Sequence, residues 1–173
     1  LPYLPPDLVV TAMTASDRAT RGQKFQVDYT VTNQGGAIPF QQARWEDLIY
    51  LSRDEFLDLT TDRFIGSVNN ERQLAAGESY SVHREFTVPA DLATEAYYVF
   101  VVTDPRRGGN QGAVFEADET NNTRAPDLPM IVEVPPPVDL EVTSISLPSS
   151  ARAGEEIVIT WTVTNQSDSV IAE

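Results

Sequence analysis

Residues 25–33 read FQVDYTVTN and alternate apolar with polar side chains. Successive side chains of a β-strand point to opposite faces, so Phe25, Val27, Tyr29 and Val31 would share one buried face. Turn signals separate this run from others rich in β-branched and aromatic residues, which predict strands at residues 9–15, 48–52, 64–68, 80–88, 96–103, 113–116 and 130–134. No stretch has a helical period. Seven to eight short strands in roughly 130 residues predict an all-β fold, an immunoglobulin-like antiparallel β-sandwich.

The segment around this strand occurs twice. Residues 7–34 read DLVVTAMTASDRATRGQKFQVDYTVTNQ, and residues 139–166 read DLEVTSISLPSSARAGEEIVITWTVTNQ, without a gap and at a constant offset of 132 positions. Self-similarity at a fixed spacing indicates repeated structural units, and this spacing is long enough for a whole domain. We therefore predict one complete sandwich over residues 7–134 and a truncated second copy, its first strands only, over residues 139–173.

Proline-rich stretches precede both copies, LPYLPP at residues 1–6 and PPPV at residues 135–138. Proline restricts φ and favours extended geometry, so we expect short semi-rigid linkers at both places. Between them, residues 97–102 (YYVFVV) are apolar on both faces. Such a strand belongs in the middle of a sheet, with its outer face covered by an edge loop or by a neighbouring module.

The composition limits the possible functions. Aspartate and glutamate number 26 against 12 lysines and arginines, a formal net charge of −14. This charge repels phosphate backbones and anionic lipids, so we expect no nucleic-acid binding and no binding to anionic membranes. No apolar run approaches the roughly 18 residues that span a bilayer, so we expect no membrane insertion. The absence of cysteine excludes disulfides, thiolate metal sites and cysteine nucleophiles.

Two acidic segments are candidate calcium (Ca²⁺) sites, because calcium takes oxygen ligands from carboxylates, amide side chains and carbonyls, often on one loop. The candidate ligands are Asp54, Asp58 and Asp62 on the first segment, and Glu116, Glu119 and Asn121 on the second. Asp47 and Asp104, at the ends of predicted strands, are lesser candidates. The alternative is that these side chains cap turns, because Asp and Asn after a strand favour chain reversal.

The residues show no catalytic constellation. His83 is the only histidine and falls on the polar side of its predicted strand, and no Gly-x-Ser-x-Gly motif occurs. We therefore expect a protein that is not an enzyme. Trp45 belongs either to the core or to a carbohydrate-stacking platform with Tyr50.

Several motifs follow one another in a characteristic order. They are PDLVVT at 6–11, GQ at 22–23, VDYTVTNQG at 27–35, WED at 45–47, IYLSRD at 49–54, IG at 65–66, LAAGESY at 74–80, YVFVVTD at 98–104 and VFEADETNN at 114–122. In this order they resemble the CARDB module, the cell adhesion related domain found in bacteria. The resemblance covers residues 7 to about 134 and begins again at Asp139.

The resemblance implies an immunoglobulin-like sandwich that occurs in tandem in large secreted or surface-anchored proteins. We therefore expect a non-catalytic structural or adhesive module of a bacterial extracellular or cell-surface protein, with calcium as a candidate stiffening ion. The alternative is a carbohydrate-binding accessory module of a secreted hydrolase. The expected partners are neighbouring repeat modules of the same chain, a second copy pairing through residues 139–173, and a glycan or surface-protein ligand.

Overall fold

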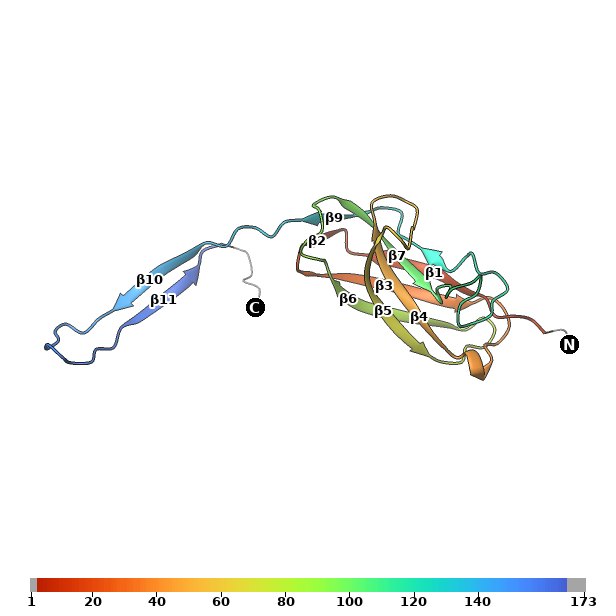
Figure 1. Cartoon of the computed structure of the whole chain (residues 1–173), viewed down its shortest axis with the longest axis horizontal. Helices are drawn as coiled ribbons and strands as arrows, with labels where there is room; N and C mark the ends of the chain where they lie inside the picture. The colour runs from red at the N-terminus through yellow and green to blue at the C-terminus, as the bar shows by residue number, and fades with distance from the viewer. Residues whose placement is uncertain (1–2, 168–173) are drawn as a thin grey trace. The chain divides into compact units, whose positions relative to one another are not determined.

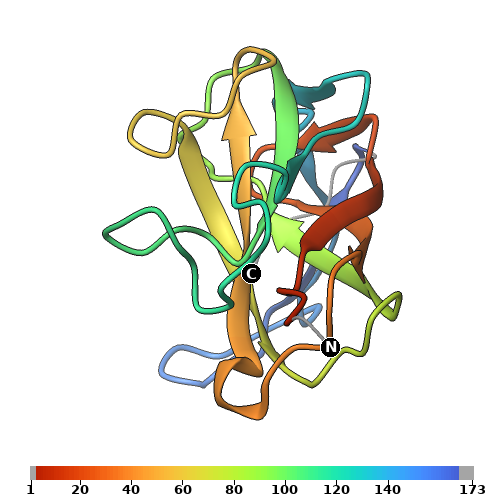
Figure 2. The ribbon, with the colours of Figure 1, turned by 90° about the vertical axis from the view of Figure 1, so that its right-hand side faces the viewer.

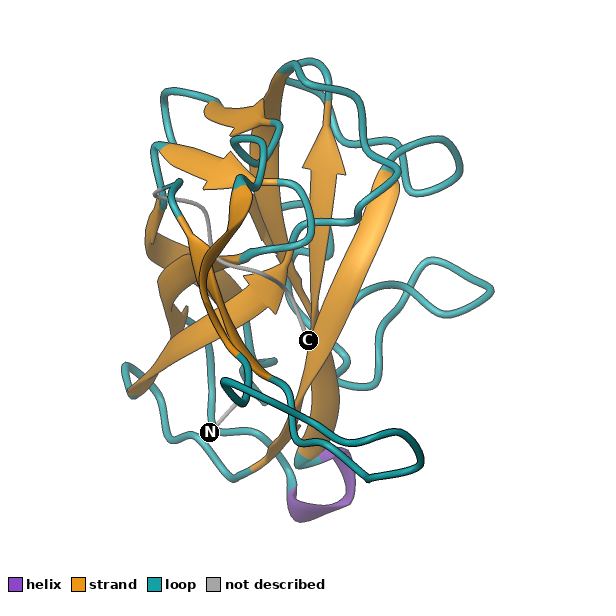
Figure 3. Cartoon of the chain, turned by 90° about the vertical axis from the view of Figure 1, so that its left-hand side faces the viewer, coloured by secondary structure: helices purple, strands orange, loops and turns teal. Residues whose placement is uncertain are grey.

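The structure is a computed structural model, and it describes residues 3–167. The chain forms two compact units divided between Glu133 and Val134, and each is described by itself (Figure 1). Within the described residues every regular element is a strand except one 3-10 turn, η1 (Phe40–Gln42) (Figure 3). None of these residues lies in a helix that is long and apolar enough to cross a membrane.

The first unit consists of seven longer strands and two very short ones. They are β1 (Leu8–Ala15), β2 (Arg18–Thr20), β3 (Lys24–Asn33), β4 (Arg44–Ser52), β5 (Arg63–Glu71), β6 (Ser79–Thr87), β7 (Ala96–Thr103), β8 (Thr123–Arg124) and β9 (Met130–Glu133).

These strands form two sheets. One has the order β1-β3-β6, and the other has the order β2-β9-β7-β4-β5, with β8 paired to β7. The pairs of the first unit are antiparallel except β2 with β9, which run parallel. The predicted all-β, immunoglobulin-like sandwich is therefore confirmed.

The core lies between the two sheets. Phe25, Val27, Tyr29 and Val31 of β3 point inward and are at most 3% exposed. They belong to one buried cluster with inward side chains of β4, β7 and β9. Burying a large apolar side chain stabilises a fold by about 1.5–3 kcal/mol, so this face of β3 accounts for much of the stability of the sheet pair.

One predicted strand is wrong: residues 113–116 form a loop. The backbone N–H groups of Ala113 and Val114 donate to the carboxylate of Asp104, at 2.8 and 2.7 Å. The next two amides also donate to side chains. Val114 is fully buried, so the segment has the alternation of a strand. Alternation does not reveal which groups accept the backbone hydrogen bonds, and here side chains accept them.

A loop covers the outer face of β7. Tyr50, Phe100 and Val102 form a small second cluster on this side of the sheet. Leu57, from the loop at residues 53–62, packs on that cluster. Residues 97–102, which are apolar on both faces, predict a cover by an edge loop or by a neighbouring module. In the first unit the cover is an edge loop.

A carboxylate lies at the centre of the core. Asp47 is 0% exposed and accepts hydrogen bonds from the hydroxyls of Tyr29 (2.8 Å), Tyr80 (2.9 Å) and Thr103 (2.8 Å). Burial raises the pKa of Asp47 above its ordinary value of 3.8, while the three hydroxyls stabilise the charged form. These hydrogen bonds link side chains of both sheets.

A buried asparagine holds the turn after β3. Asn33 is 0% exposed; its Nδ2 donates to the carbonyl of Gly36 (2.7 Å), and its Oδ1 accepts from the N–H of Asp7 (3.0 Å). A Cβ atom at Gly35 would lie 2.2 Å from the carbonyl oxygen of Pro5. The chain can therefore pass this close to the turn only because residue 35 is a glycine.

The second unit repeats the first pair of strands. β10 (Leu140–Ser146) and β11 (Thr160–Asn165) pair antiparallel, with each Cα partner displaced by 132 positions from its counterpart in β1 and β3, including the register shift after Val142. Gly22 and Gly154 both have positive φ, 76° and 83°. The apolar face is exposed here: Trp161 is 62% exposed, whereas its counterpart Tyr29 is 3% exposed. The repeated sequence therefore has a repeated local structure.

Candidate functional site

The strongest candidate site is a hollow of about 310 Å³ beside the loop that joins β7 to β8. This loop, residues 104–122, lies at the end of the first unit where the N-terminal segment enters (Figure 2). Asp104, Glu119 and Asn122 line the hollow, and Leu59 of the loop at residues 53–62 borders it. The hollow therefore combines acidic and amide side chains with one arginine, Arg106, and some apolar surface.

Asp104 begins the loop and organises it. Its φ of 41° is in the left-handed region, which Asp adopts more readily than most residues, and it turns the chain away from β7. Both carboxylate oxygens accept backbone N–H groups, those of Ala113 and Val114, which close the loop on itself. Burial raises the pKa of Asp104 to about 6, and repulsion by Glu119 acts in the same direction.

Glu116 connects this loop to the N-terminal segment. Its Oε2 accepts the N–H of Leu8 (2.5 Å), and its Oε1 accepts from Nδ2 of Asn122 (2.7 Å). The pKa of Glu116 is raised to about 8, chiefly by burial, and the nearby carboxylates of Asp104 and Glu119 act in the same direction. Repulsion among these three acidic groups favours either protonation or a bound cation, while Arg107 acts in the opposite direction on Asp104.

Two amide oxygens beside these carboxylates lack a hydrogen-bond partner. Asn121 donates from Nδ2 to Oδ1 of Asp7 (2.9 Å), and Asn122 donates to Glu116, but the Oδ1 atom of each asparagine is buried and accepts no hydrogen bond. Asn122 is 5% exposed. A buried oxygen without a donor is costly, so an ion or a water molecule at these atoms would be stabilising.

The chemistry of this donor set suits a hard cation such as calcium, which prefers carboxylate and amide oxygens. The two carboxylate oxygens of Glu119 accept the N–H groups of Glu116 (3.1 Å) and Gly112 (3.2 Å), and each keeps one lone pair. Between residues 3 and 167, no three Asp, Glu, His or Cys side chains converge as a metal-binding group. An ion here would therefore need amide or carbonyl oxygens and water as additional ligands.

The first acidic segment lies on a separate loop and forms turns. Asp54 accepts the N–H of Phe56 (2.8 Å), Asp58 that of Thr60 (2.9 Å), and Asp62 that of Asp58 (2.7 Å). The hydrogen bonds from Thr60 lower the pKa of Asp58. The six predicted calcium ligands therefore fall into two groups of three, and the first group shows the turn-capping geometry that the sequence also allows.

The lesser candidates have different places. Asp104 is the most buried acid of the hollow, whereas Asp47 is inside the core and bound by hydroxyls. The parity of Asp47 with the buried Trp45 and Ile49 in β4 is the signal that could have placed it inward. The contact of Asp7 with the 104–122 loop has no local signal, because it joins residues far apart in the chain.

The remaining residues of interest have structural roles. Trp45 is 3% exposed and donates its indole N–H to the hydroxyl of Tyr80 (3.1 Å). Tyr50 belongs to the cluster on the outer face, so the two rings do not form a carbohydrate-stacking platform. His83 is exposed on β6 and its Nδ1 lies 2.9 Å from the carboxylate of Asp28.

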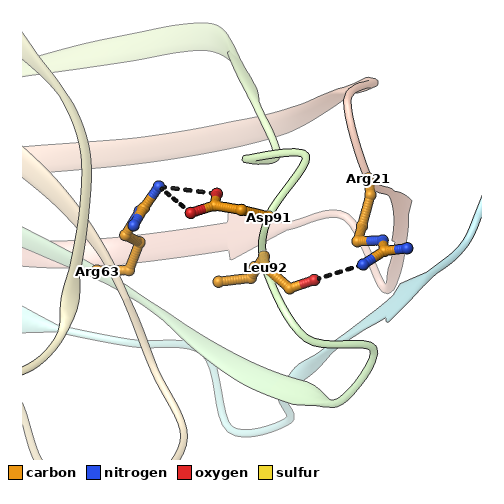
Figure 4. A network of polar contacts seen from close by, with 4 residues as sticks. All are labelled: Arg21, Arg63, Asp91 and Leu92. Atoms are coloured by element: carbon orange, nitrogen blue, oxygen red, sulfur yellow. Dashed lines mark hydrogen bonds and ion pairs between the residues drawn. The ribbon is translucent and has the colours of Figure 1, made fainter.

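A second hollow, of about 510 Å³, lies between the loop at residues 53–62 and the loop at residues 88–95. Nη2 of Arg63 donates to both carboxylate oxygens of Asp91 (2.9 and 3.2 Å). Arg21 donates to the carbonyl of Leu92 (3.2 Å) (Figure 4). Because β5 and the turn after β2 both hold it, the 88–95 loop is fixed in place.

Comparison with known proteins agrees with this architecture. The family model named CARDB matches residues 5–126. The chain belongs to the CARDB family. The CARDB family is a non-catalytic, cell-adhesion-related domain family. No curated protein sequence matches the chain.

Two solved structures of a CARDB domain from Pyrococcus furiosus are similar to this one. The crystal structure, which is in complex with di-metal ions, has 15% sequence identity and a TM-score of 0.50, over 75% of this chain and 90% of that one. The solution NMR structure has 18% identity and a TM-score of 0.49, over 73% of this chain and 94% of that one. At these identities the likeness concerns the fold alone.

Proposed function

We propose that this CARDB domain is a non-catalytic structural and adhesive module of a larger extracellular or cell-surface protein in which such modules follow one another. The second unit carries the proposal: β10 and β11 repeat β1 and β3 in sequence and register, 132 positions later. A unit that recurs on one chain at the spacing of a whole domain is the pattern of a modular array. The partners of the module would then be its neighbours in the same chain.

The contacts of the N-terminal segment support a stiff joint between modules. The carbonyl oxygens of Pro5 and Pro6 accept the N–H groups of Gly36 and Ala117, both at 2.7 Å. Two successive residues of the proline-rich segment are thus bonded to two different loops of the module. A linker held in this way transmits the orientation of one module to the next better than a free linker does.

The array is tested by hydrogen exchange on the parent protein. If the rest of a second module covers β10 and β11, their amides are as strongly protected as those of β1 and β3. Amides of β10 and β11 that exchange within seconds in the parent protein would contradict the proposal. Attachment of beads coated with the chain to cells and to immobilised glycans tests adhesion; attachment no greater than that of bare beads would contradict the adhesive part.

We further propose that calcium stiffens the module at the hollow lined by Asp104, Glu119 and Asn122, where Glu116 and Asn121 are also close. The buried amide oxygens without donors and the crowded carboxylates support this place over the loop at residues 53–62. The related domain from Pyrococcus furiosus, crystallised with di-metal ions, shows that at least one CARDB domain takes metal. Calcium would draw the carboxylates together and supply the missing partner of the amide oxygens.

The calcium proposal is tested by thermal unfolding with calcium, magnesium or a chelator. An ion at 100 times its Kd that binds the folded state alone stabilises it by about 2.7 kcal/mol. Asn122→Ala is expected to abolish the shift in Tm, and Asp58→Ala, on the other acidic loop, to leave it intact. A midpoint that does not respond to calcium contradicts the proposal, and a shift abolished by Asp58→Ala would place the ion on the other loop.

The exposed face of the second unit suggests a further partner. We propose that two copies of the 173-residue chain associate through this face, because the matching residues of the first unit are buried. Light scattering after size-exclusion chromatography, on the full chain and on one ending at Glu133, checks this. We expect a dimer only for the full chain; a monomer in both cases would be evidence against association.

A further inference from the structure

The second and the last strands of the first unit, β2 and β9, lie side by side and run in the same direction. In the β2–β9 pair, Arg18, Ala19 and Thr20 are opposite Ile131, Val132 and Glu133. Hydrogen bonds continue beyond the pair at both ends: Ile131 donates its N–H to the carbonyl of Asp17, and Arg21 donates its N–H to that of Glu133, both at 2.9 Å. Among the described strands no other pair is parallel.

This pairing determines how tension acts on the module. The chain enters at one end of the first unit, and β9 leaves it at the other (Figure 1). Tension at the entry reaches β2 through β1, which is itself paired with β3. It pulls β2 towards the entry and β9 towards the exit, so these two strands must slide past each other before the part of the unit that follows β2 can extend. The hydrogen bonds between β2 and β9 lie across the direction of pull, so they share the load and must break together. Bonds of a hairpin opened from its end carry the load one after another.

Both strands are also tied to the loop at residues 88–95. Gly22 donates its N–H to the carbonyl of Val88 (2.9 Å), and Arg21 donates from its side chain to the carbonyl of Leu92 (3.2 Å). On the side of β9, Val132 donates its N–H to the carbonyl of Glu95 (2.9 Å). The ion pair of Arg63 with Asp91 holds this loop in turn (Figure 4). The loop therefore opposes the sliding of β2 and β9 from a second side.

Side-chain contacts add to the backbone pairing. An ion pair joins Arg18 and Glu133 across the two strands. Ala19, Met130 and Val132 are at most 7% exposed, so sliding would also expose apolar surface of the core.

We propose that β2 and β9 form a mechanical clamp, which makes the first unit resist tension along the chain more strongly than tension across it. The clamp is a property of this unit alone, and the proposed array is only the setting in which it would be used. Failure of the clamp would therefore leave the array proposal untouched.

Single-molecule force spectroscopy on the whole chain, pulled from its two ends, tests the clamp. The backbone groups of Asp17 and Arg21 both bond to β9. Because bonding directions alternate along a strand, the N–H of Ala19, midway between these two residues, also faces β9, and the N–H of Thr20 faces away from it. Ala19→Pro removes a bond of the clamp, and we expect it to raise the unfolding rate under load roughly tenfold or more. Thr20→Pro is the matched control, because proline is tolerated where the N–H of an edge strand points to solvent. Equal effects of the two prolines would overturn the proposal.

A second measurement does not depend on the proline variants folding. The chain has no cysteine, so Ser67→Cys and Ser81→Cys, on the exposed faces of β5 and β6, provide handles for pulling across the sheets. This direction does not load β2 against β9, and we expect a clearly lower unfolding force than for pulling from the two ends. An unfolding force that is the same in both directions would overturn the clamp.

Discussion

Removing the hydroxyl of Tyr29 tests the buried polar network directly. In Tyr29→Phe the ring keeps its place in the core, while the carboxylate of Asp47 loses a donor at 2.8 Å. A hydrogen bond to a charged group is worth about 1.5–3 kcal/mol, and one to a neutral group about 0.5–1.5 kcal/mol. The cost of the substitution should therefore depend on whether Asp47 is ionised.

The sign of this dependence follows from the raised pKa of Asp47. The folded state holds this proton more tightly than the unfolded state, so stability from this group is greatest at low pH and falls as pH rises through the pKa in the folded state. Tyr29→Phe removes a donor to the anion and raises that pKa further. We expect a loss of about 1 kcal/mol near pH 3.5 and of about 2–3 kcal/mol at pH 8.

Urea unfolding of the wild type and the variant at several pH values measures the difference. The matched control is Tyr50→Phe. Tyr50 lies in the outer cluster with only burial acting on its pKa, and we expect a change under about 0.5 kcal/mol at every pH. A Tyr29→Phe loss that is as small as that of Tyr50→Phe, or that does not grow with pH, would refute the role of Asp47 as a buried anion.

Three further substitutions probe other parts of the fold. Gly35→Ala places a Cβ atom 2.2 Å from a backbone oxygen. We expect the free energy of unfolding to fall by roughly 2 kcal/mol or more and the amide of Leu8 to exchange faster. Gly109→Ala, whose Cβ atom meets no atom within 4 Å, is the control. Asp104→Ala leaves two amides of the 104–122 loop without acceptors and should cost roughly 2–4 kcal/mol in urea unfolding, and a loss under 1 kcal/mol would contradict its organising role. Hydrogen bonds from Gln26 and from His83 lower the pKa of Asp28, so its contribution to stability is present above pH 3.8 and is lost as pH falls further. Asp28→Asn should therefore lower the free energy of unfolding at pH 7 and have little effect at the acid end, and a loss of equal size at both pH values would argue against this role.

Alternation in the sequence predicts the long strands well, because the two faces of a half-buried strand meet different surroundings. β2 and β8 escape this signal, since three or two residues carry no period. Residues 113–116 carry the signal without forming a strand, because Asp104 and other side chains accept their backbone hydrogen bonds. The sequence left two possibilities for what covers the outer face of β7, an edge loop or a neighbouring module. Only the packing of Leu57 shows that the first unit uses a loop.

The candidate site was predictable only where its members are close in sequence. Glu116, Glu119 and Asn121 lie within one loop, so their grouping is visible in the sequence. Asp7 joins them from a position more than 100 residues away, and Asp104 through the way its loop folds back on itself. Such contacts depend on which ends of the strands meet in the sandwich, and a linear pattern does not contain that information.

By itself, the sequence determined the β-sandwich, its acidic and cysteine-free character and the repeated first pair of strands, because each of these depends on composition or on spacing along the chain. Only the tertiary structure decided that Asp47 lies inside the core with hydroxyl partners, that Asn122 keeps a buried oxygen without a donor, and that β2 lies parallel to β9. These features arise where segments distant in the chain come together, and the balance of burial against hydrogen bonding is settled only there.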